Sequence, residues 1–468
     1  MNGTSRALWR TVIFAAIIIA LPIHVACQSQ TPLTSVSVQQ QSTTPSHETE
    51  SKPHVLTLNQ ALREALEANR RIRSANNLLG AATANVRQNE AKLYGELTAS
   101  VSFQALNDRQ LLRPLAGPVS PTAISQLPFA QYQLHSGVSY NYPLFVAGKL
   151  AYQIQISRLT AEIARVMLAE TKADIVYNVT TLYVESVALH EQIKALEAEL
   201  KELATTERHV RLSVTIGKIP GVDLLKVTDR IEETHAHLAS VLSQRTHALS
   251  ALSAMLGRDD SHGVIPGDLP HSLPAITVSS DQLFALASKS NPVLSTEAQA
   301  AQAQNSVNIA RSSLMPQVQL QLNYFEHTNP GYPLNSQDTW SVGFQVSLPL
   351  FDGGERRAEL ESAKHKAIAA EEQAHQAKLE VRAHLDGALA SWDAAQQQLT
   401  ATDAQVKAAD EVARIEQLRY DTGSGNIEDL LRARARQTAA QSSHIEALAA
   451  VFVAAAEINH VVSEEVVK

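Results

Sequence analysis

Two aspartates are the strongest candidates for chemistry in this sequence. Asp223 lies in "TIGKIPGVDLLK" (215–226), and Asp429 lies 206 residues further on in the related segment "DTGSGNIEDLLR" (421–432). Each follows a turn and begins a predicted helix, where free backbone N–H groups and the helix dipole stabilise a carboxylate. Each aspartate is therefore either a helix cap or, where several copies meet at one axis, part of a ring that attracts cations.

The sign of the charge at such a ring depends on neighbouring cations. Lys218 and Lys226 flank the first aspartate, and Arg432 and Arg434 follow the second. If these side chains rather than the aspartates point toward the axis, the local field is positive.

The other reactive side chains give weaker signals. The 17 histidines are scattered, and His235 and His237 are two positions apart on a predicted helix, so they do not share a face. There is no H-E-x-x-H motif, no paired-cysteine motif, no P-loop and no G-x-S-x-G. We therefore expect no catalytic site, no metal and no cofactor.

The elements that position the aspartates occur twice. Gly217 and Gly423 align in the two turns, and Phe145 and Phe351 align further upstream, each pair again 206 residues apart. Equal spacing indicates an internal duplication in which the intervening segment has a fixed length.

The two phenylalanines mark predicted strand-to-helix junctions. They lie in "YPLFVAG" (142–148) and "LPLFDGG" (348–354), where proline can end ladder pairing and glycine permits a sharp change of direction. The residues assigned to these junctions are Pro143, Phe145, Pro349, Phe351, Gly353 and Gly354.

The segments between junction and turn are predicted to be long helices. Residues 150–216 contain no Pro or Gly, and 355–422 contain only Gly387. At 1.5 Å per residue each helix is about 100 Å long. Two shorter predicted helices, 222–257 and 281–314, have the summed length to match one long helix when stacked end to end.

Four segments ahead of the junctions alternate between apolar and polar residues. They are 96–105, 132–142, 317–324 and 340–348. Such alternation fits both a membrane β-barrel and a half-buried soluble sheet; the long helices favour the barrel, because no second layer is visible to cover a soluble sheet. Open edges are not tolerated in lipid, so four strands must combine with those of other chains, and three chains give twelve strands.

The N-terminal region resembles an export signal followed by a tether. Arg6 and Arg10 precede the apolar run 11–23, which is too short to span a bilayer as a helix. We assign 1–27 to a signal peptide and the Ser/Thr/Gln-rich segment 28–54 to a flexible linker. The only cysteine, Cys27, is either a lipid attachment site or a residue without a role beside an ordinary cleavage site. Val25 and Ala26 fit the pattern that precedes a lipid attachment site, and His24 does not.

Composition excludes some functions. The net charge is −8 and aromatic residues are 5% of the chain, with no basic block, so we expect no nucleic-acid binding.

These features resemble the TolC-like outer-membrane efflux protein family over residues 55–463. The resemblance is carried by "LPLFDGGE", by the paired "G…DLL" turns, and by "ALASKSNP" (285–292) with its echo "ALREALEAN" (61–69). It implies a homotrimer with one twelve-stranded barrel in the bacterial outer membrane, continued by a periplasmic helical tunnel. It also implies export driven by an inner-membrane pump through a periplasmic adaptor protein, without catalysis. By this resemblance Asp429 matches a constriction aspartate, whereas Arg432 and Gly425 depart from the pattern of the family.

We therefore expect an α+β fold: a trimeric twelve-stranded membrane β-barrel, four strands per chain, continued by a long periplasmic α-helical barrel with a small equatorial domain at mid-length. The expected domains are a first repeat (55–257), an equatorial connection (258–280), a second repeat (281–463) and a C-terminal tail (464–468). The expected function is the exit duct of a tripartite efflux or type I secretion system. The alternative is a periplasmic or surface coiled-coil interaction protein without a pore, which explains the helices but not the duplicated hairpins.

Overall fold

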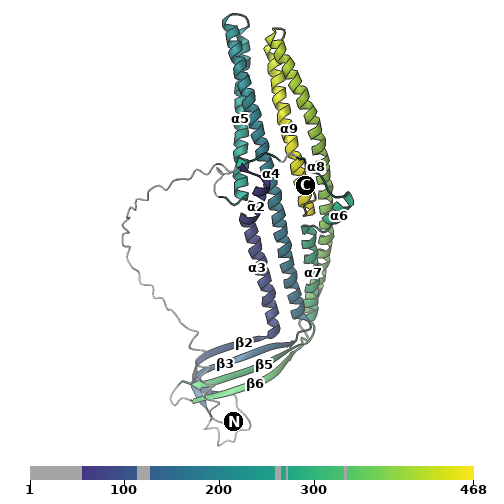
Figure 1. Ribbon diagram of the computed structural model, residues 1–468. Coiled ribbons are helices and arrows are strands. Elements are labelled where there is room, and N and C mark those ends of the chain that lie inside the picture. The colour runs from purple at the N-terminus through teal and green to yellow at the C-terminus, as the bar shows by residue number, and fades with distance from the viewer. Residues whose placement is uncertain (1–54, 113–126, 259–264, 270–271, 331–334, 468) are drawn as a thin grey trace, which may run out of the picture. The chain divides into compact units, whose positions relative to one another are not determined.

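The computed structural model describes residues 55–112, 127–258, 265–269, 272–330 and 335–467. The predicted signal peptide, the linker and Cys27 lie outside these residues. The described chain contains long helices and one four-stranded sheet, which agrees with the α+β expectation (Figure 1).

The order of elements is the same in both halves of the chain. Each half has a broken helix, a two-stranded hairpin, a very long helix and a helix about half as long. In the first half these are α2 (Leu58–Ala68), α3 (Arg70–Ala91), β2 (Glu96–Leu111), β3 (Phe129–Phe145), α4 (Lys149–Thr215) and α5 (Gly221–Met255). In the second half they are α6 (Ser280–Ala287), α7 (Asn291–Ser312), β5 (Gln317–Asn329), β6 (Asn335–Ser347), α8 (Glu355–Asp421) and α9 (Ile427–Val462).

The two longest helices confirm the fixed spacing of the repeat. Helices α4 and α8 have 67 residues each. The first residues of the two helices are 206 positions apart, and so are their last residues. At 1.5 Å per residue both are about 100 Å long.

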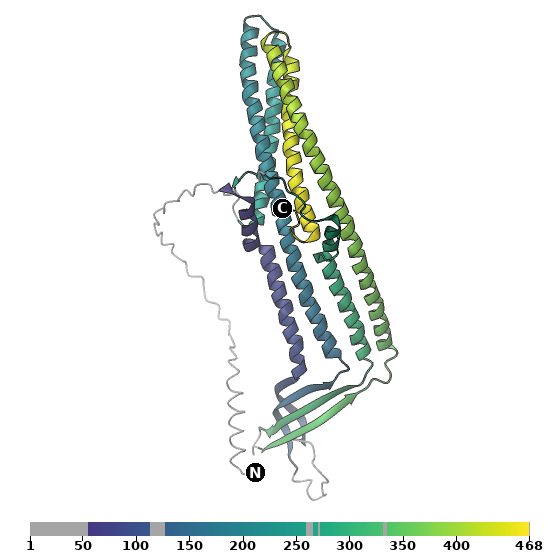
Figure 2. The same ribbon diagram turned by 45° about the vertical axis from the view of Figure 1, so that its right-hand side comes forward.

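The shorter helices stack along the long ones, but not as expected. Both α3 and α5 pack on α4, while α7 and α9 pack on α8 (Figure 2). The expectation that 222–257 and 281–314 form one end-to-end stack differs from this arrangement, in which α7 packs along α8 and also along α4.

The expected helix 281–314 is also two helices. Helix α6 ends at Ala287 and α7 begins at Asn291, after the N-cap Ser290 and with Pro292 in its first turn. Proline lacks a backbone N–H and is favoured at a helix start, so it begins a new helix here rather than continuing the old one.

The sheet is fully antiparallel, with strand order β2-β3-β5-β6. The register places Leu97, Tyr140, Leu322 and Val342 in one row on one face of the sheet. The adjacent row, Thr98, Ser139, Asn323 and Ser341, lies on the other face and is polar. Strands β2 and β6 have no further neighbour among the described residues.

The two largest clusters of buried apolar residues lie in the helices, at their mid-length. One cluster joins α2, α4 and α5, and another joins α6, α8 and α9. Helix α9 is long and apolar enough to cross a membrane by length and composition, and several of its apolar residues are buried in this second cluster.

Short extended segments complete the mid-length region. Strand β1 (Val55–Leu56) pairs in parallel with β4 (Ile265–Pro266). The Tyr183 hydroxyl on α4 is 3.0 Å from the carbonyl oxygen of Leu56 and 3.2 Å from that of Gly267. Near the C-terminus, Val467 bridges to Ile276, so the segment assigned to a tail is bound to the segment assigned to the equatorial connection.

Candidate functional site

The two helix-hairpin tips have the same backbone turn. The N–H of Lys218 donates to the carbonyl of Ser213, and the N–H of Ser424 donates to that of Arg419, both at 2.9 Å. The residue directly before each donor is a glycine in the left-handed region, with φ +73° at Gly217 and +75° at Gly423. This is the Schellman arrangement, which satisfies carbonyl groups left free at the helix end and favours glycine.

Both aspartates lie in the first turn of the helix that follows. Asp223 is the third residue of α5, and Asp429 is the third residue of α9. Asn426 caps α9, because its Oδ1 accepts a hydrogen bond from the Asp429 N–H and its Nδ2 donates to Asp429 Oδ2, both at 2.8 Å. Asp429 is thus part of a helix cap, and its side chain remains 42% exposed.

The tip charges are paired across the two hairpins. Lys226 Nζ on α5 lies 3.7 Å from Asp223 Oδ1 and 3.4 Å from Glu428 Oε2 on α9. Arg432 lies 2.9 Å from Glu428 Oε1 and 3.8 Å from Asp429 Oδ1. Three carboxylates therefore meet two cations in this network, and the network has a net negative charge.

Packing beneath the network holds the hairpins together. Buried residues of α4, α5 and α9 form one apolar cluster: Leu203, Val210, Val227, Ile427, Leu430 and Leu431. Tyr420, at the end of α8, packs against this cluster, and burial followed by the nearby Asp223 carboxylate raises the pKa of its hydroxyl above the usual 10.

Sequence reasoning placed Asp223, Asp429, Arg432 and the two turn glycines together at the tips, and the structure has them there. It missed Glu428, the residue that binds both Lys226 and Arg432. The four-residue spacing from Glu428 to Arg432 was a usable signal for one ion pair on α9. No sequence pattern indicates the pair with Lys226, because it joins different hairpins.

The two strand-to-helix junctions also share a backbone path. The N–H of Lys149 donates to the Val146 carbonyl, and the N–H of Glu355 donates to the Asp352 carbonyl, at equivalent positions. Both junctions contact the end of α7: Ser312 Oγ donates to the Ala147 carbonyl at 2.7 Å, and Arg356 donates to the Ser313 carbonyl at 2.9 Å.

One junction residue behaves differently from the expectation. Pro349 follows the end of β6, but Pro143 lies within β3 and does not end its pairing. The ladder continues through an irregularity to Phe145, which faces Val318. A bulge accommodates the missing N–H of proline, so the strand runs two residues past it. Phe145 and Phe351 are both exposed, at 52% and 91%.

The apolar face of the sheet is uncovered in the single chain. Trp340 is 75% exposed and Phe344 is 68% exposed, while the equivalent face of β2 exposes Leu97, Val101 and Phe103 at 60% or more. On the opposite face, Gln321 donates to Gln345 and Asn323 donates to Ser341. Among the described residues, the sheet therefore has one exposed apolar face, one polar face and two edge strands without a neighbour.

A family model described as "Outer membrane efflux protein" matches residues 61–258 and 285–462. The chain belongs to the outer membrane efflux protein family. This family consists of channels, and its location is the outer membrane. The two matched segments cover most of the two structural repeats.

Individual relatives are more distant. The chain is 25% identical over 264 residues to protein CyaE of Bordetella pertussis, covering 55% of this chain and 54% of that protein. It is 26% identical over 218 residues to outer membrane protein OprJ of Pseudomonas aeruginosa, covering 45% of this chain and 44% of that protein. The chain thus spans about half the length of these relatives.

The fold is similar to that of a solved channel over nearly the whole chain. The crystal structure of the CmeC outer membrane channel of Campylobacter jejuni matches with a TM-score of 0.77 and 15% identity, covering 92% of this chain and 94% of that one. At this identity the match supports the fold.

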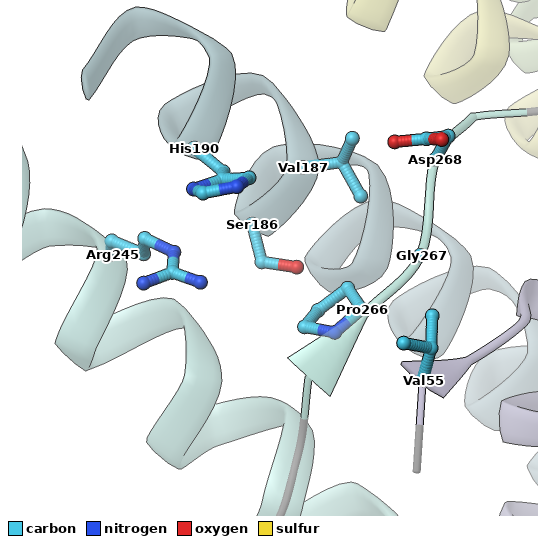
Figure 3. Close-up of a pocket in the computed structure, with 8 residues that line it drawn as sticks. All are labelled: Val55, Ser186, Val187, His190, Arg245, Pro266, Gly267 and Asp268. Carbon is cyan, nitrogen blue, oxygen red and sulfur yellow. The ribbon is translucent and has the colours of Figure 1, made fainter. Parts of the chain in front are cut away.

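Within this family fold, a pocket of about 230 Å³ with both polar and apolar lining residues lies at mid-length between α4, α5 and β4 (Figure 3). His190 and Arg245 face it from the two helices, and Asp268 faces it from the other side. Burial, followed by the charge of Arg245, lowers the pKa of the His190 imidazole below 6.5. The imidazole is therefore neutral at pH 7, and the charges of this pocket are one arginine and one aspartate.

Proposed function

We propose that three copies of this chain form the exit duct of a tripartite efflux or type I secretion system. The observation that carries the proposal is the four-stranded sheet with an exposed apolar face and two unpaired edges. Three such sheets joined edge to edge make a twelve-stranded barrel that satisfies the backbone groups of β2 and β6 in lipid. A coiled-coil rod without a pore gives no reason for this sheet.

The helices continue the duct in the periplasm. Their length of about 100 Å exceeds anything a compact domain needs, and the long helices α4 and α8 begin where β3 and β6 end. An inner-membrane pump and a periplasmic adaptor protein deliver the substrate to the helical tips. The chain itself transports passively and is not an enzyme.

The edge-to-edge arrangement is tested with paired cysteines in a Cys27→Ser background. Thr98→Cys on β2 and Gln345→Cys on β6 both lie on the polar face at the same end of the sheet. We expect a short thiol crosslinker to join them between chains and to give a covalent trimer in a denaturing gel.

The matched control is Thr98→Cys with Ser139→Cys, whose positions face each other within one chain. This pair crosslinks without forming trimers. If the test pair also gives only monomers, and the purified protein shows no conductance in a planar bilayer, the exit-duct proposal is wrong.

We further propose that Asp223 and Asp429 line the periplasmic entrance and give it cation preference. Three carboxylates against two cations per chain support a negative ring in a trimer, even with Arg432 bound to Glu428. Gly217 and Gly423 set the turns that bring these helices to the tip.

Reversal potentials across a salt gradient test this role. Asp429→Asn is expected to reduce cation selectivity, whereas Asp403→Asn, an exposed aspartate of α8 paired with Lys407, leaves it unchanged. An unaltered reversal potential for Asp429→Asn would leave that residue as a helix cap only.

Cys27 is proposed as a lipid attachment site that anchors the mature N-terminus in membrane lipid. Mass spectrometry of the purified protein decides this: a diacylated or triacylated cysteine supports the anchor. An unmodified terminus at or beyond Gln28 rules it out.

A further inference from the structure

Two histidines face each other on the polar side of the sheet. His135 of β3 and His327 of β5 are directly opposite in the strand register. Their Nδ1 atoms are 2.6 Å apart, and the rings meet edge to face with centroids 4.8 Å apart. One Nδ1 therefore donates to the other, and both nitrogens point into the same small volume.

An unsatisfied oxygen lies in the same row of the sheet. Gln337 of β6 is directly opposite His327, so Ser102, His135, His327 and Gln337 form one row across four strands on the polar face. The Oε1 atom of Gln337 is buried and has no hydrogen-bond partner in the described chain. A buried acceptor without a partner carries a desolvation cost, which a bound cation or donor removes.

A neighbouring hydroxyl fixes the orientation of one ring. His327 Nε2 is 2.8 Å from Thr339 Oγ1. When Nε2–H donates to this oxygen, the lone pair of His327 lies on Nδ1 and points toward His135. Histidines that bind metals are commonly held in this way, with the second ring nitrogen bonded to an oxygen.

We propose that this row binds a divalent transition-metal ion through His135 Nδ1 and His327 Nδ1, with Gln337 Oε1 as an oxygen ligand and water completing the shell. Imidazole nitrogens suit Zn²⁺, Ni²⁺ and Cu²⁺ rather than Mg²⁺ or Ca²⁺. In a tetrahedral zinc site, Zn–N bonds of about 2.0–2.1 Å place two nitrogens about 3.3 Å apart, so the rings need to separate by under about 1 Å.

The ion takes the place of the hydrogen bond between the rings. The proton on the donating Nδ1 moves to Nε2 of the same neutral ring, so each Nδ1 offers a lone pair and no net proton is released. The described residues contain no cluster of three or more His, Cys, Asp and Glu side chains suited to a metal, and this row has no carboxylate. A site of two imidazoles and one amide binds reversibly rather than as a permanent structural metal.

The site lies on the face proposed to line the channel, so water in the lumen gives the ion access. This access rests on the proposed function, whereas the ligand set comes from contacts within one chain. Metal binding is measured on purified protein and does not require transport, so the metal site and the exit duct are tested independently. A protein that binds the ion but does not conduct would contradict only the exit-duct proposal.

Calorimetric titration of the detergent-solubilised full chain with Zn²⁺ is the test. We expect one ion per chain and a loss of affinity of about 10-fold or more in both His135→Ala and His327→Ala, with a smaller loss in Gln337→Ala. His135→Gln is a second variant that keeps a polar side chain in the row. His235→Ala, on the exposed face of α5, controls for background binding by other histidines and leaves the titration unchanged.

Electron paramagnetic resonance of the Cu²⁺-loaded protein counts the ligands. Coupling to two imidazole nitrogens in the wild type, and its loss in either histidine variant, supports the site. If His135→Ala and His327→Ala, with unchanged helix content, titrate like the wild type, the metal site is disproved.

Discussion

The two repeats follow the same backbone path with different residues at its most constrained points. At the strand-to-helix junctions, Ala147 and Gly353 are equivalent and both are left-handed, with φ +50° and +67°. The next residue is a left-handed glycine in both, Gly148 and Gly354. An alanine in this region costs more than a glycine, because its Cβ crowds the backbone.

The tips differ in a similar way. Pro220 and Asn426 are equivalent N-cap positions, and both have an extended backbone. The asparagine caps α9 with its side chain, whereas the proline gives α5 no side-chain cap. The glycine turns before them share the hydrogen bond from Lys218 or Ser424 described above, and the second turn adds one from the Gly425 N–H to the Arg419 carbonyl.

The difference shows which features the architecture requires. The length of the longest helix, the turn geometry and the junction path are the same in both halves. Side chains that only tune local stability differ between the halves. Substitutions that copy one repeat into the other therefore test which residues belong to each class.

The largest effect is expected on the apolar face of the sheet, to which both repeats contribute residues. Phe344 of β6 and Val138 of β3 are equivalent residues on this face. Arg at either position is expected to cost about 2–4 kcal/mol if the residue lies near the bilayer midplane, because the charge must enter lipid. The free energy of unfolding from lipid vesicles, measured by urea titration, gives this cost.

Gln345→Arg is the matched control, since the side chain next to Phe344 lies on the polar face. A small effect at 345 with a large one at 344 fits the assigned faces. The reverse result would show that the sheet faces lipid with its other side.

The next effect concerns the helix cap that only one repeat has. Asn426→Ala removes the bond to the Asp429 N–H and is expected to cost about 1 kcal/mol. Pro220→Ala at the equivalent position removes no side-chain bond, and we expect no loss of a cap there. Amide hydrogen exchange in the first turns of α5 and α9 distinguishes the two variants. If Pro220→Ala lost as much protection in α5 as Asn426→Ala loses in α9, the capping role would be contradicted.

Much of this arrangement follows from sequence because periodicity and spacing are local. The bounds of α4 and α8 lie within one residue of those expected, since no Pro or Gly interrupts their interiors except Gly387, which the helix tolerates. The alternation of 340–348 likewise identified which face of β6 is apolar.

Other features could not be predicted from the sequence, because they depend on contacts between distant segments. The packing of both α3 and α5 on α4 depends on which helices meet in space, and the ion pair between Lys226 and Glu428 joins two hairpins. The break before α7 had a local signal, the sequence "SNP" with proline in a first turn, and was missed because the apolar pattern continues across it.

A smaller effect is expected at the left-handed junction residue. Ala147→Gly makes the first junction like the second and is expected to stabilise the protein by up to about 1 kcal/mol, whereas Gly353→Ala is expected to destabilise it by a similar amount. Gly353 has open space at the site of a Cβ, so the cost at 353 is conformational rather than steric contact with neighbours. Thermal unfolding of both variants checks the opposite signs, and a shift in the same direction for both would contradict the argument.

The smallest effect is a difference in pH dependence between the repeats. Glu170 of α4 is equivalent to Gln376 of α8. Burial, followed by repulsion from Asp174, raises the pKa of the Glu170 carboxyl above its usual value near 4.5. Asp174 is itself paired with His460 of α9, at 2.8 Å, so Glu170 lies at a contact between the repeats. Gln376 instead is exposed and donates to Glu380.

Because the folded state binds the Glu170 proton more tightly than the unfolded state, this group favours folding at low pH. That contribution is complete below about pH 4.5 and is lost as the pH rises through the raised pKa of the folded state. Glu170→Gln, which copies the second repeat, is expected to raise stability at pH 7 by under about 1 kcal/mol, since solvent screens a half-exposed group. Gln376→Glu, on an exposed face, is the reciprocal control and should change stability less. Unfolding midpoints measured from acid to neutral pH test this prediction. The stability gained by Glu170→Gln is expected to grow as the pH rises. A gain that is the same at every pH would show that packing, and not ionisation, causes the difference between the two repeats at this position.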